Sequence, residues 1–250
     1  MAAAVKLHRH VGRRRAGRFL AEGPNLVEAA ADRGLVREVF VTDEAAQRHA
    51  SLLAGERFPV HLVTERAAKA LSDTVTPTGL VAVCDMPATR LADVLAGAPR
   101  LIAVAVEVGE PGNAGTLIRI AHAMGAGAVI LAGHSVDPYN GKSLRASAGS
   151  IFTIPVAAEP DAIAAVGALR AAGLRVLATT LDAETRLDEA DLGAPTAWLF
   201  GSEAHGLAAE IAEAADGCVR IPMAGAQSLN VAAAAAICLY QSAHALGCLR

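Results

Sequence analysis

Aromatic residues are scarce in this sequence, at 3% of the chain, although 53% of its residues are hydrophobic. A core in such a chain must be built from Ala, Val, Leu and Ile. Internal repeats, low-complexity tracts and a heptad pattern are also absent. The length of 250 residues suits one large globular domain or two of modest size.

Cysteine is also scarce, and its spacing forms no motif. The four cysteines are Cys84, Cys218, Cys238 and Cys248. Their spacing matches neither a C-x-x-C metal-binding pair nor a small disulfide scaffold. We therefore expect reduced thiols, as in cytoplasmic proteins, and no metal site.

The sequence has no hydrophobic run that would span a bilayer. The alanine-rich tract at residues 231–239 is shorter than the roughly 20 residues that a transmembrane helix needs, and polar residues follow it. The cationic N-terminus has no apolar run of the length that a signal peptide needs before Glu22. We expect a cytoplasmic protein without a membrane role.

A strong positive charge, which is common in nucleic-acid-binding proteins, is absent as well, because the formal net charge is −3. The cations are unevenly distributed, however. Those that precede the first acidic residue are Lys6, Arg9, Arg13, Arg14, Arg15 and Arg18. The cluster Arg13, Arg14 and Arg15 could bind the phosphates of a nucleic acid. A merely solubilising terminus is the alternative.

Short apolar runs alternate with helical patterns in the first third of the chain. The pattern predicts a helix over residues 26–31 and strands over residues 38–41, 60–63 and 80–84. We predict a small α/β domain over residues 1–87. A linker follows over residues 88–99, where Pro and Gly flank a short helical stretch.

From residue 100 onward, nearly continuous apolar runs are separated by helical patterns. The predicted strands are residues 101–106, 128–131, 174–178, 197–200 and 218–221. Such runs are typical of parallel strands that helices cover on both faces. We predict a second α/β domain with a parallel sheet over residues 100–250, in a strand order that the pattern does not reveal.

Three segments of this second domain place small polar residues where strands meet helices. The first begins at Asn113 and continues into a helix whose apolar stripe leaves Arg119 facing away from it. The second follows a predicted strand and contains Gly201 and Glu203. In the third, IPMAGAQSLNV, Ser228 stands where a helix cap belongs. Such a junction can hold a ligand, and a simple capped helix is the alternative.

In this order and spacing, the three segments resemble the three motifs of the SpoU (TrmH-type) RNA ribose 2′-O-methyltransferases. Residues 137–140 (DPYN) and 145–150 (RASAGS) resemble the link between two of the family's motifs. Residues 22–24 (EGP) and 27–29 (VEA) resemble the opening of its substrate-binding domain. The resemblance extends over nearly the whole chain, from about residue 15 to about residue 246.

The resemblance implies a fold for both domains. Residues 100–250 would form a SPOUT-type domain whose C-terminal segment threads a deep trefoil knot. The N-terminal domain would be a ribosomal L30e-like module that binds the RNA substrate. The resemblance also implies a homodimer formed through the knotted domain.

The resemblance further implies a cofactor and assigns site residues. The methyl donor would be S-adenosylmethionine, and its transfer to a ribose oxygen is an in-line displacement that needs no metal. The implied cofactor-binding residues are Gly201, Ile221, Met223 and Leu229, with Thr179 as a further wall. The implied catalytic residues are Arg119, Asn113, Glu203, Ser228 and Asn230. The implied RNA contacts, beside the N-terminal arginines, are Lys142, Arg145 and Ser147.

The chemistry of these residue types limits their roles. A guanidinium with a pKa above about 12 is a poor base, so we expect Arg119 to bind phosphate and orient the 2′-hydroxyl. A surface salt bridge is the alternative. Asn113 would cap its helix or contact the ribose, and Glu203 would orient Asn113 or Arg119, or favour the start of the next helix. Ser228 and Asn230 would lie near the methyl donor or cap the last helix.

The expected reaction is methylation of a ribose in 23S ribosomal RNA, because family members with an L30e-like domain act on ribosomal RNA. A transfer RNA methyltransferase is one alternative. A non-catalytic RNA-binding or ribosome-assembly protein of the same fold is another. Resistance to an antibiotic through ribosome methylation would be the same chemistry, and the modified nucleotide is left open.

Overall fold

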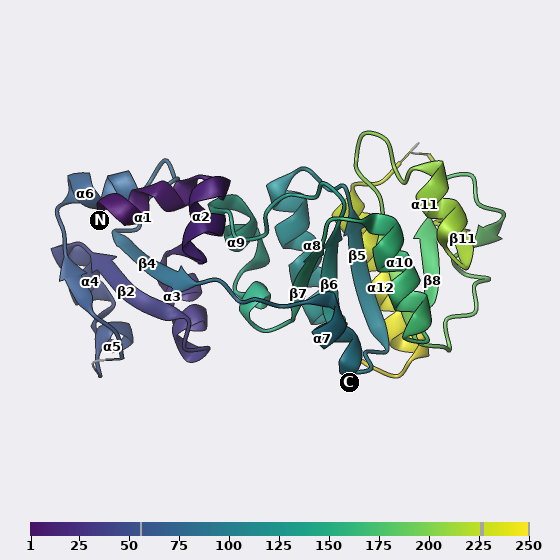
Figure 1. Ribbon diagram of the computed structural model, residues 1–250, viewed down its shortest axis with the longest axis horizontal. Helices are drawn as coiled ribbons and strands as arrows, with labels where there is room; N and C mark the ends of the chain where they lie inside the picture. The colour runs from purple at the N-terminus through teal and green to yellow at the C-terminus, as the bar shows by residue number, and fades with distance from the viewer. Residues whose placement is uncertain (56, 226–227, 250) are drawn as a thin grey trace. The chain divides into compact units, whose positions relative to one another are not determined.

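The computed structural model describes residues 1–55, 57–225 and 228–249 (Figure 1). The chain folds into two compact units. Unit 1 comprises Met1–Pro87 and Asp137–Phe152, and unit 2 comprises Ala88–Val136 and Thr153–Arg250. The sequence pattern had assigned the whole of residues 100–250 to the C-terminal domain, whereas the contacts of Asp137–Phe152 are with unit 1.

Unit 1 is built on a four-stranded sheet with the order β1-β4-β2-β3. Its strands are β1 (Arg18–Glu22), β2 (Val36–Val41), β3 (Val60–Leu62) and β4 (Leu80–Asp85). β4 pairs antiparallel with β1 and β2, and β2 pairs parallel with β3. The three predicted strands are confirmed. β1 was not predicted, because only three apolar residues separate Arg18 from Glu22.

Short helices surround this sheet. They are α1 (Ala2–Val5), α2 (His10–Ala16), α3 (Pro24–Asp32), α4 (Asp43–Arg48), α5 (Ala50–Leu53), α6 (Glu65–Leu71) and α9 (Gly141–Ser147), with 3-10 turns η1 (Lys6–His8) and η2 (Ser150–Phe152). Threonine side chains cap α4 and α6, because the hydroxyls of Thr42 and Thr64 accept hydrogen bonds from backbone N–H groups of the first turn. α3 contains the predicted helix and buries Leu26 and Val27.

One arginine of the N-terminal cationic cluster belongs to the interior of unit 1. Arg13 is 4% exposed, and its Nε and Nη2 lie 2.7 and 2.6 Å from Oδ2 of Asp137. Its Nη1 donates to two backbone carbonyls of the preceding turn. The prediction that Arg13 contacts RNA is therefore wrong, because its guanidinium is engaged inside the unit. Arg14 and Arg15 on the same helix are exposed.

Replacing Arg13 with alanine is expected to destabilise unit 1 by about 3 kcal/mol, because the largely buried Asp137 carboxylate loses its arginine partner and keeps only the exposed His10 at 4.0 Å. Hydrogen exchange at the amides of α2 and β1 measures this loss within unit 1. Arg14→Ala on the same helix is the matched control, and its effect should stay within about 0.5 kcal/mol. Equal exchange rates in the two variants would contradict this account.

Aromatic contacts also hold Asp137–Phe152 in unit 1. The rings of Tyr139 and Phe152 lie against Phe19 of β1, with centroids 5.0 and 5.8 Å from its ring. Phe19 is fully buried. These three residues account for much of the aromatic content of unit 1, so the segment contributes to its core.

Unit 2 contains a seven-stranded sheet in which every pair of neighbouring strands is parallel. Its strands are β5 (Leu101–Val106), β6 (Ala128–Ala132), β7 (Val156–Glu159), β8 (Arg175–Thr179), β9 (Thr185–Arg186), β10 (Thr196–Phe200) and β11 (Gly217–Arg220). The five predicted strands and their parallel arrangement are confirmed. β7 and β9 were not predicted, because each has few large apolar residues.

Helices cover both faces of this sheet. They are α7 (Leu91–Ala96), α8 (Pro111–Ala123), α10 (Ala162–Ala171), α11 (Ala209–Ala214) and α12 (Val231–Ala245). Alternate residues of β5, beginning at Ile102, join one buried cluster with α10 and α11. α8 and α12 pack against each other and against β5. In the described part of the chain, no helix combines the length and the apolar character needed to cross a membrane.

The strand order β7-β6-β5-β10-β8-β11-β9 places β10 between β5 and β8. After β5 the chain adds β6 and β7 on one side of it. β8 comes next on the other side, and β10, which follows later in the sequence, lies between β5 and β8. The carboxyl ends of these central strands therefore meet where the strand order reverses. Open parallel sheets bind ligands at such an edge. The strand order alone does not describe how the chain threads, so the trefoil knot stays a prediction.

Candidate active site

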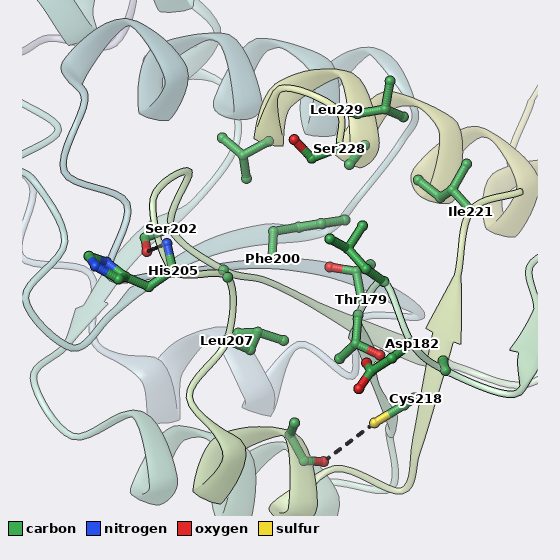
Figure 2. A pocket seen from close by; sticks show the side chains of 18 of the residues that line it. Thr179, Asp182, Phe200, Ser202, His205, Leu207, Cys218, Ile221, Ser228 and Leu229 are labelled. Carbon is green, nitrogen blue, oxygen red and sulfur yellow. Dashed lines mark hydrogen bonds between the residues drawn. The ribbon is translucent and has the colours of Figure 1, made fainter. Parts of the chain in front are cut away.

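A cavity of about 880 Å³ opens at this edge of unit 2 (Figure 2). Its walls come from residues 179–183 after β8, 200–207 after β10, 218–223 around the end of β11, and 228–234 at the start of α12. The volume lies in the usual range for small-molecule sites. Residues of α11 also line it, so five segments of unit 2 enclose one space.

All residues predicted to bind the cofactor line this cavity: Thr179, Gly201, Ile221, Met223 and Leu229. Two predicted catalytic residues, Ser228 and Glu203, line it as well. Figure 2 shows Ser228 and Leu229 on one side of the cavity and Thr179 on another. The fold therefore gathers around one cavity all of the predicted cofactor-binding residues and two of the predicted catalytic ones.

A tight turn after β10 forms part of this wall. Ser202 and Gly206 exchange two backbone hydrogen bonds of 3.1 and 2.9 Å, and Gly206 has a φ of +66°. A β carbon at Gly201 would lie only 2.2 Å from the carbonyl carbon of Gly206. The backbone N–H of His205 donates to Oγ of Ser202 at 3.3 Å, within the same turn. Glycine at position 201 is thus a steric requirement.

Side-chain hydrogen bonds join three predicted catalytic residues that come from the three motifs. Asn113 on α8 donates through Nδ2 to Oε1 of Glu203, and its Oδ1 accepts from Nδ2 of Asn230 at 3.0 Å. These pairs are 90 and 117 residues apart in sequence. An amide whose donor and acceptor are both engaged has a defined orientation. The network therefore fixes the Asn113 carboxamide between a carboxylate and a second amide.

Of the helix caps expected from the sequence, the one formed by Asn230 is confirmed. Glu110 caps α8, because its Oε2 accepts from the backbone N–H of Asn113 at 2.7 Å. Asn230 caps α12 by accepting from the N–H of Ala232 at 2.9 Å. Capping by Asn113 and by Ser228 is therefore wrong, since a capping residue must directly precede the first turn. Ala226 and Gln227 of the third motif lie outside the described residues.

Arg119 faces away from the interior of unit 2. It is exposed on α8, whereas Leu117 and Ala121 of the predicted apolar stripe are buried. Among the described residues it has no hydrogen-bond or ion-pair partner, and it does not line the cavity. The alternative that it forms a surface salt bridge within the chain is therefore not supported.

The remaining predicted RNA contacts lie on α9 of unit 1. Arg145 forms an ion pair with Asp73 and is partly exposed, and Lys142 is exposed. Ser147 is fully buried, and its hydroxyl donates to the carbonyl of Leu144 at 2.8 Å. The prediction that Ser147 contacts RNA is therefore wrong, because the hydroxyl is enclosed within the fold.

The four cysteines are free thiols. Within the described ranges, no group of three or more His, Cys, Asp or Glu side chains is arranged to hold a metal ion. Cys218 lines the cavity, and its thiol donates to the carbonyl of Ala212. Burial raises the pKa of Cys238 to about 12 and also raises that of Cys84 well above its usual value, so both thiols stay protonated.

Two further carboxylates line the cavity, and the sequence pattern did not single them out. They belong to Asp182 and Glu213. Asp182 follows the end of β8 by three residues, so its place at the carboxyl edge of the sheet could have indicated it. Glu213 lies on α11, and no sequence signal marked it.

Comparison with protein-family models gives two matches. The model described as the SpoU rRNA Methylase family matches residues 100–240. The model described as the MRM3-like substrate binding domain matches residues 2–82. Together these matches extend over most of the chain.

Two curated relatives match almost the full length of the chain. The 23S rRNA (guanosine(2553)-2′-O)-methyltransferase of Bacillus subtilis is 37% identical, over 94% of this chain and 92% of that protein. The 23S rRNA (uridine(2479)-2′-O)-methyltransferase of Streptomyces viridochromogenes is 35% identical, over 92% of this chain and 84% of that protein.

Solved structures match both units. The AdoMet-bound rRNA methyltransferase from Sinorhizobium meliloti has a TM-score of 0.87 at 31% identity, and covers 98% of this chain and 94% of its own. The SpoU methyltransferase AviRb from Streptomyces viridochromogenes, also in complex with AdoMet, has a TM-score of 0.86 at 32% identity, over 97% and 95%. The A. aeolicus TrmH/SpoU tRNA modifying enzyme covers only 62% of this chain and 81% of its own, with a TM-score of 0.53 at 26% identity.

Proposed function

Because this chain belongs to the SpoU rRNA Methylase family, we propose that it transfers a methyl group from S-adenosylmethionine to a ribose 2′-hydroxyl of 23S ribosomal RNA. The observation that carries this proposal is that side-chain hydrogen bonds join Asn113, Glu203 and Asn230, one residue from each motif, in the same unit as the cavity. The AdoMet complexes of two similar structures support the cofactor. Two relatives that match almost the full length are named 23S rRNA 2′-O-methyltransferases, which supports 23S ribosomal RNA as the substrate.

The cavity suits S-adenosylmethionine in size and in the character of its walls. When bound, this cofactor supplies a methyl group on a positively charged sulfur, which is open to in-line attack. Ile221, Met223 and Leu229 offer apolar surface, and the turn at Gly201 brings bare backbone to the cavity. Thr179 is held in place because its hydroxyl donates to the carbonyl of Leu199 at 2.9 Å.

The polar network and Arg119 would act on the RNA. The oriented Asn113 carboxamide and the Glu203 carboxylate can hydrogen-bond a ribose, with Ser228 at the edge of the cavity. Arg119, whose guanidinium has no partner among the described residues, can bind an RNA phosphate and so orient the 2′-hydroxyl toward the methyl group. The hydroxyl proton would leave to that phosphate or to water.

The exposed face of α12 supports a homodimer formed through unit 2. Ile237 is 38% exposed and Tyr240 is 50% exposed on this helix. α12 packs beside α8, which carries Arg119. A second copy of the chain would cover these apolar side chains and lie next to the helix of Arg119. Sedimentation of the purified protein measures the oligomeric state.

Unit 1 would bind RNA through exposed cations. Arg14 and Arg15 on α2 are exposed, and no ion pair is recorded for either among the described residues. Lys142 and Arg145 on α9 are further candidates, although the ion pair with Asp73 limits Arg145. Contacts to phosphate of this kind position an RNA without reading its sequence.

Transfer of labelled methyl groups to different RNAs tests the substrate. Purified 23S ribosomal RNA, assembled large ribosomal subunits and transfer RNA are each incubated with the protein and labelled S-adenosylmethionine. We expect label in 23S ribosomal RNA or the large subunit. Label in transfer RNA alone would support the transfer RNA alternative, and RNA binding without label on any RNA would support a non-catalytic protein.

A further inference from the structure

The charged residues that line the cavity are of one sign. Asp182, Glu203 and Glu213 line it, and among its described lining residues there is no lysine or arginine. Glu203 accepts a hydrogen bond from the neutral Asn113, which leaves its negative charge uncompensated. No ion pair is recorded for Asp182 or Glu213 among the described residues. Figure 2 shows the Asp182 side chain between Thr179 and Cys218.

Methyl transfer changes the charge of the cofactor. The bond between sulfur and the methyl carbon breaks, and a bond between the ribose oxygen and that carbon forms. The bonding electrons return to sulfur, which becomes a neutral thioether, and the hydroxyl proton passes to solvent or phosphate. The product S-adenosylhomocysteine keeps the adenine, the ribose and the amino acid group, so the donor differs from it only in one methyl group and one positive charge.

We infer that Asp182 and Glu213 are specificity-determining residues that favour the cationic methyl donor over its neutral product. This inference rests on the proposed function. Contacts to the adenine or the ribose stabilise donor and product equally, whereas a negative cavity stabilises the donor alone. Loss of the charge during the reaction therefore weakens binding of the product and promotes its exchange for a new donor molecule.

Calorimetric titration of the full-length protein, without RNA, tests this inference with three ligands. They are S-adenosylmethionine, S-adenosylhomocysteine and sinefungin, in which an ammonium group replaces the methylsulfonium centre. The variants are Asp182→Asn, Glu213→Gln and the double variant, which remove charge with little change of shape. The matched controls are Glu184→Gln and Glu210→Gln, because these nearby carboxylates do not line the cavity.

Each single variant should lower the affinity for S-adenosylmethionine and for sinefungin about threefold, and the double variant about tenfold. The effects are this small because exposed charges interact weakly through water. The affinity for S-adenosylhomocysteine should change by less than about 1.5-fold. Raising the ionic strength of the buffer should lower the affinity of wild type for the two cationic ligands. It should also reduce the difference in affinity between wild type and the variants. The control variants should bind all three ligands like wild type.

Other results would overturn the inference. An equal loss for donor and product would mean that the carboxylates contact a shared group, such as the ribose. Unchanged affinity for both ligands, or an equal loss of affinity in the control variants, would mean that the charges of Asp182 and Glu213 do not discriminate between donor and product. If wild type bound neither donor nor product, the proposed function itself would fail. Binding of both by wild type separates that failure from failure of the inference alone.

Discussion

Arg119→Ala is expected to lower the rate of methyl transfer to ribosomal RNA on the order of 10³-fold, because a positioned cation that acts on the reacting group contributes about this much. The affinity of the Arg119→Ala variant for S-adenosylmethionine should equal that of wild type, since Arg119 does not line the cavity. Initial rates at saturating cofactor give the first quantity, and calorimetric titration gives the second.

Two further variants show whether the effect is specific. Arg119→Lys keeps the charge but loses the planar, two-pronged guanidinium, so its rate should lie between those of wild type and Arg119→Ala. Arg90→Ala removes another exposed arginine of unit 2 that is far from the motifs in sequence, and it should leave the rate unchanged. A rate for Arg119→Ala within about twofold of wild type would remove Arg119 from the mechanism.

Gly201→Ala is expected to reduce affinity for S-adenosylmethionine by about 100-fold or more, because displacement of a binding wall by about 1 Å has effects of this size. The added β carbon would meet the backbone of Gly206 at 2.2 Å, and backbone atoms cannot rotate away as a side chain can. The turn over residues 202–206 must then move. We also expect unit 2 to lose about 2 kcal/mol of stability.

Trp198 provides a local readout for this variant. It is the single tryptophan of the chain, lies fully buried on β10, and donates from Nε1 to Oγ of Ser242 at 2.8 Å. Its fluorescence during thermal unfolding therefore reports on unit 2. Gly167→Ala on α10, where a β carbon meets nothing within 4 Å, is the control and should not lower stability. Unchanged cofactor binding by Gly201→Ala would contradict the placement of the cofactor beside this turn.

The parallel sheet of unit 2 could be predicted because its strands are nearly continuous apolar runs. β5, for example, is the buried run LIAVAV, and its predicted bounds agree with the structure. The strand order could not be predicted, since hydrophobic periodicity carries no information about which strands pair. Because β10 lies between β5 and β8 and is parallel to both, the residues that follow these three strands are neighbours at one edge of the sheet.

The residues of the candidate site could be named from the motifs, but their contacts only in part. Contact between Glu203 and Asn113 was one of the alternatives expected, whereas nothing in the sequence indicated that the Asn113 amide also contacts Asn230. The same holds for Arg13 and Asp137, which are 124 residues apart. In a run of arginines, the one that turns inward is determined by a distant partner, so the local pattern indicated only a surface cluster.

The chemical form of the transferred label tests the central claim most directly. After reaction with labelled S-adenosylmethionine, the ribosomal RNA is hydrolysed completely with alkali, which requires a free 2′-hydroxyl to cleave the neighbouring phosphodiester. A ribose 2′-O-methyltransferase leaves the label in an alkali-resistant dinucleotide, and this is the result we predict. Label recovered only in mononucleotides would place the methyl group on a base and contradict the account.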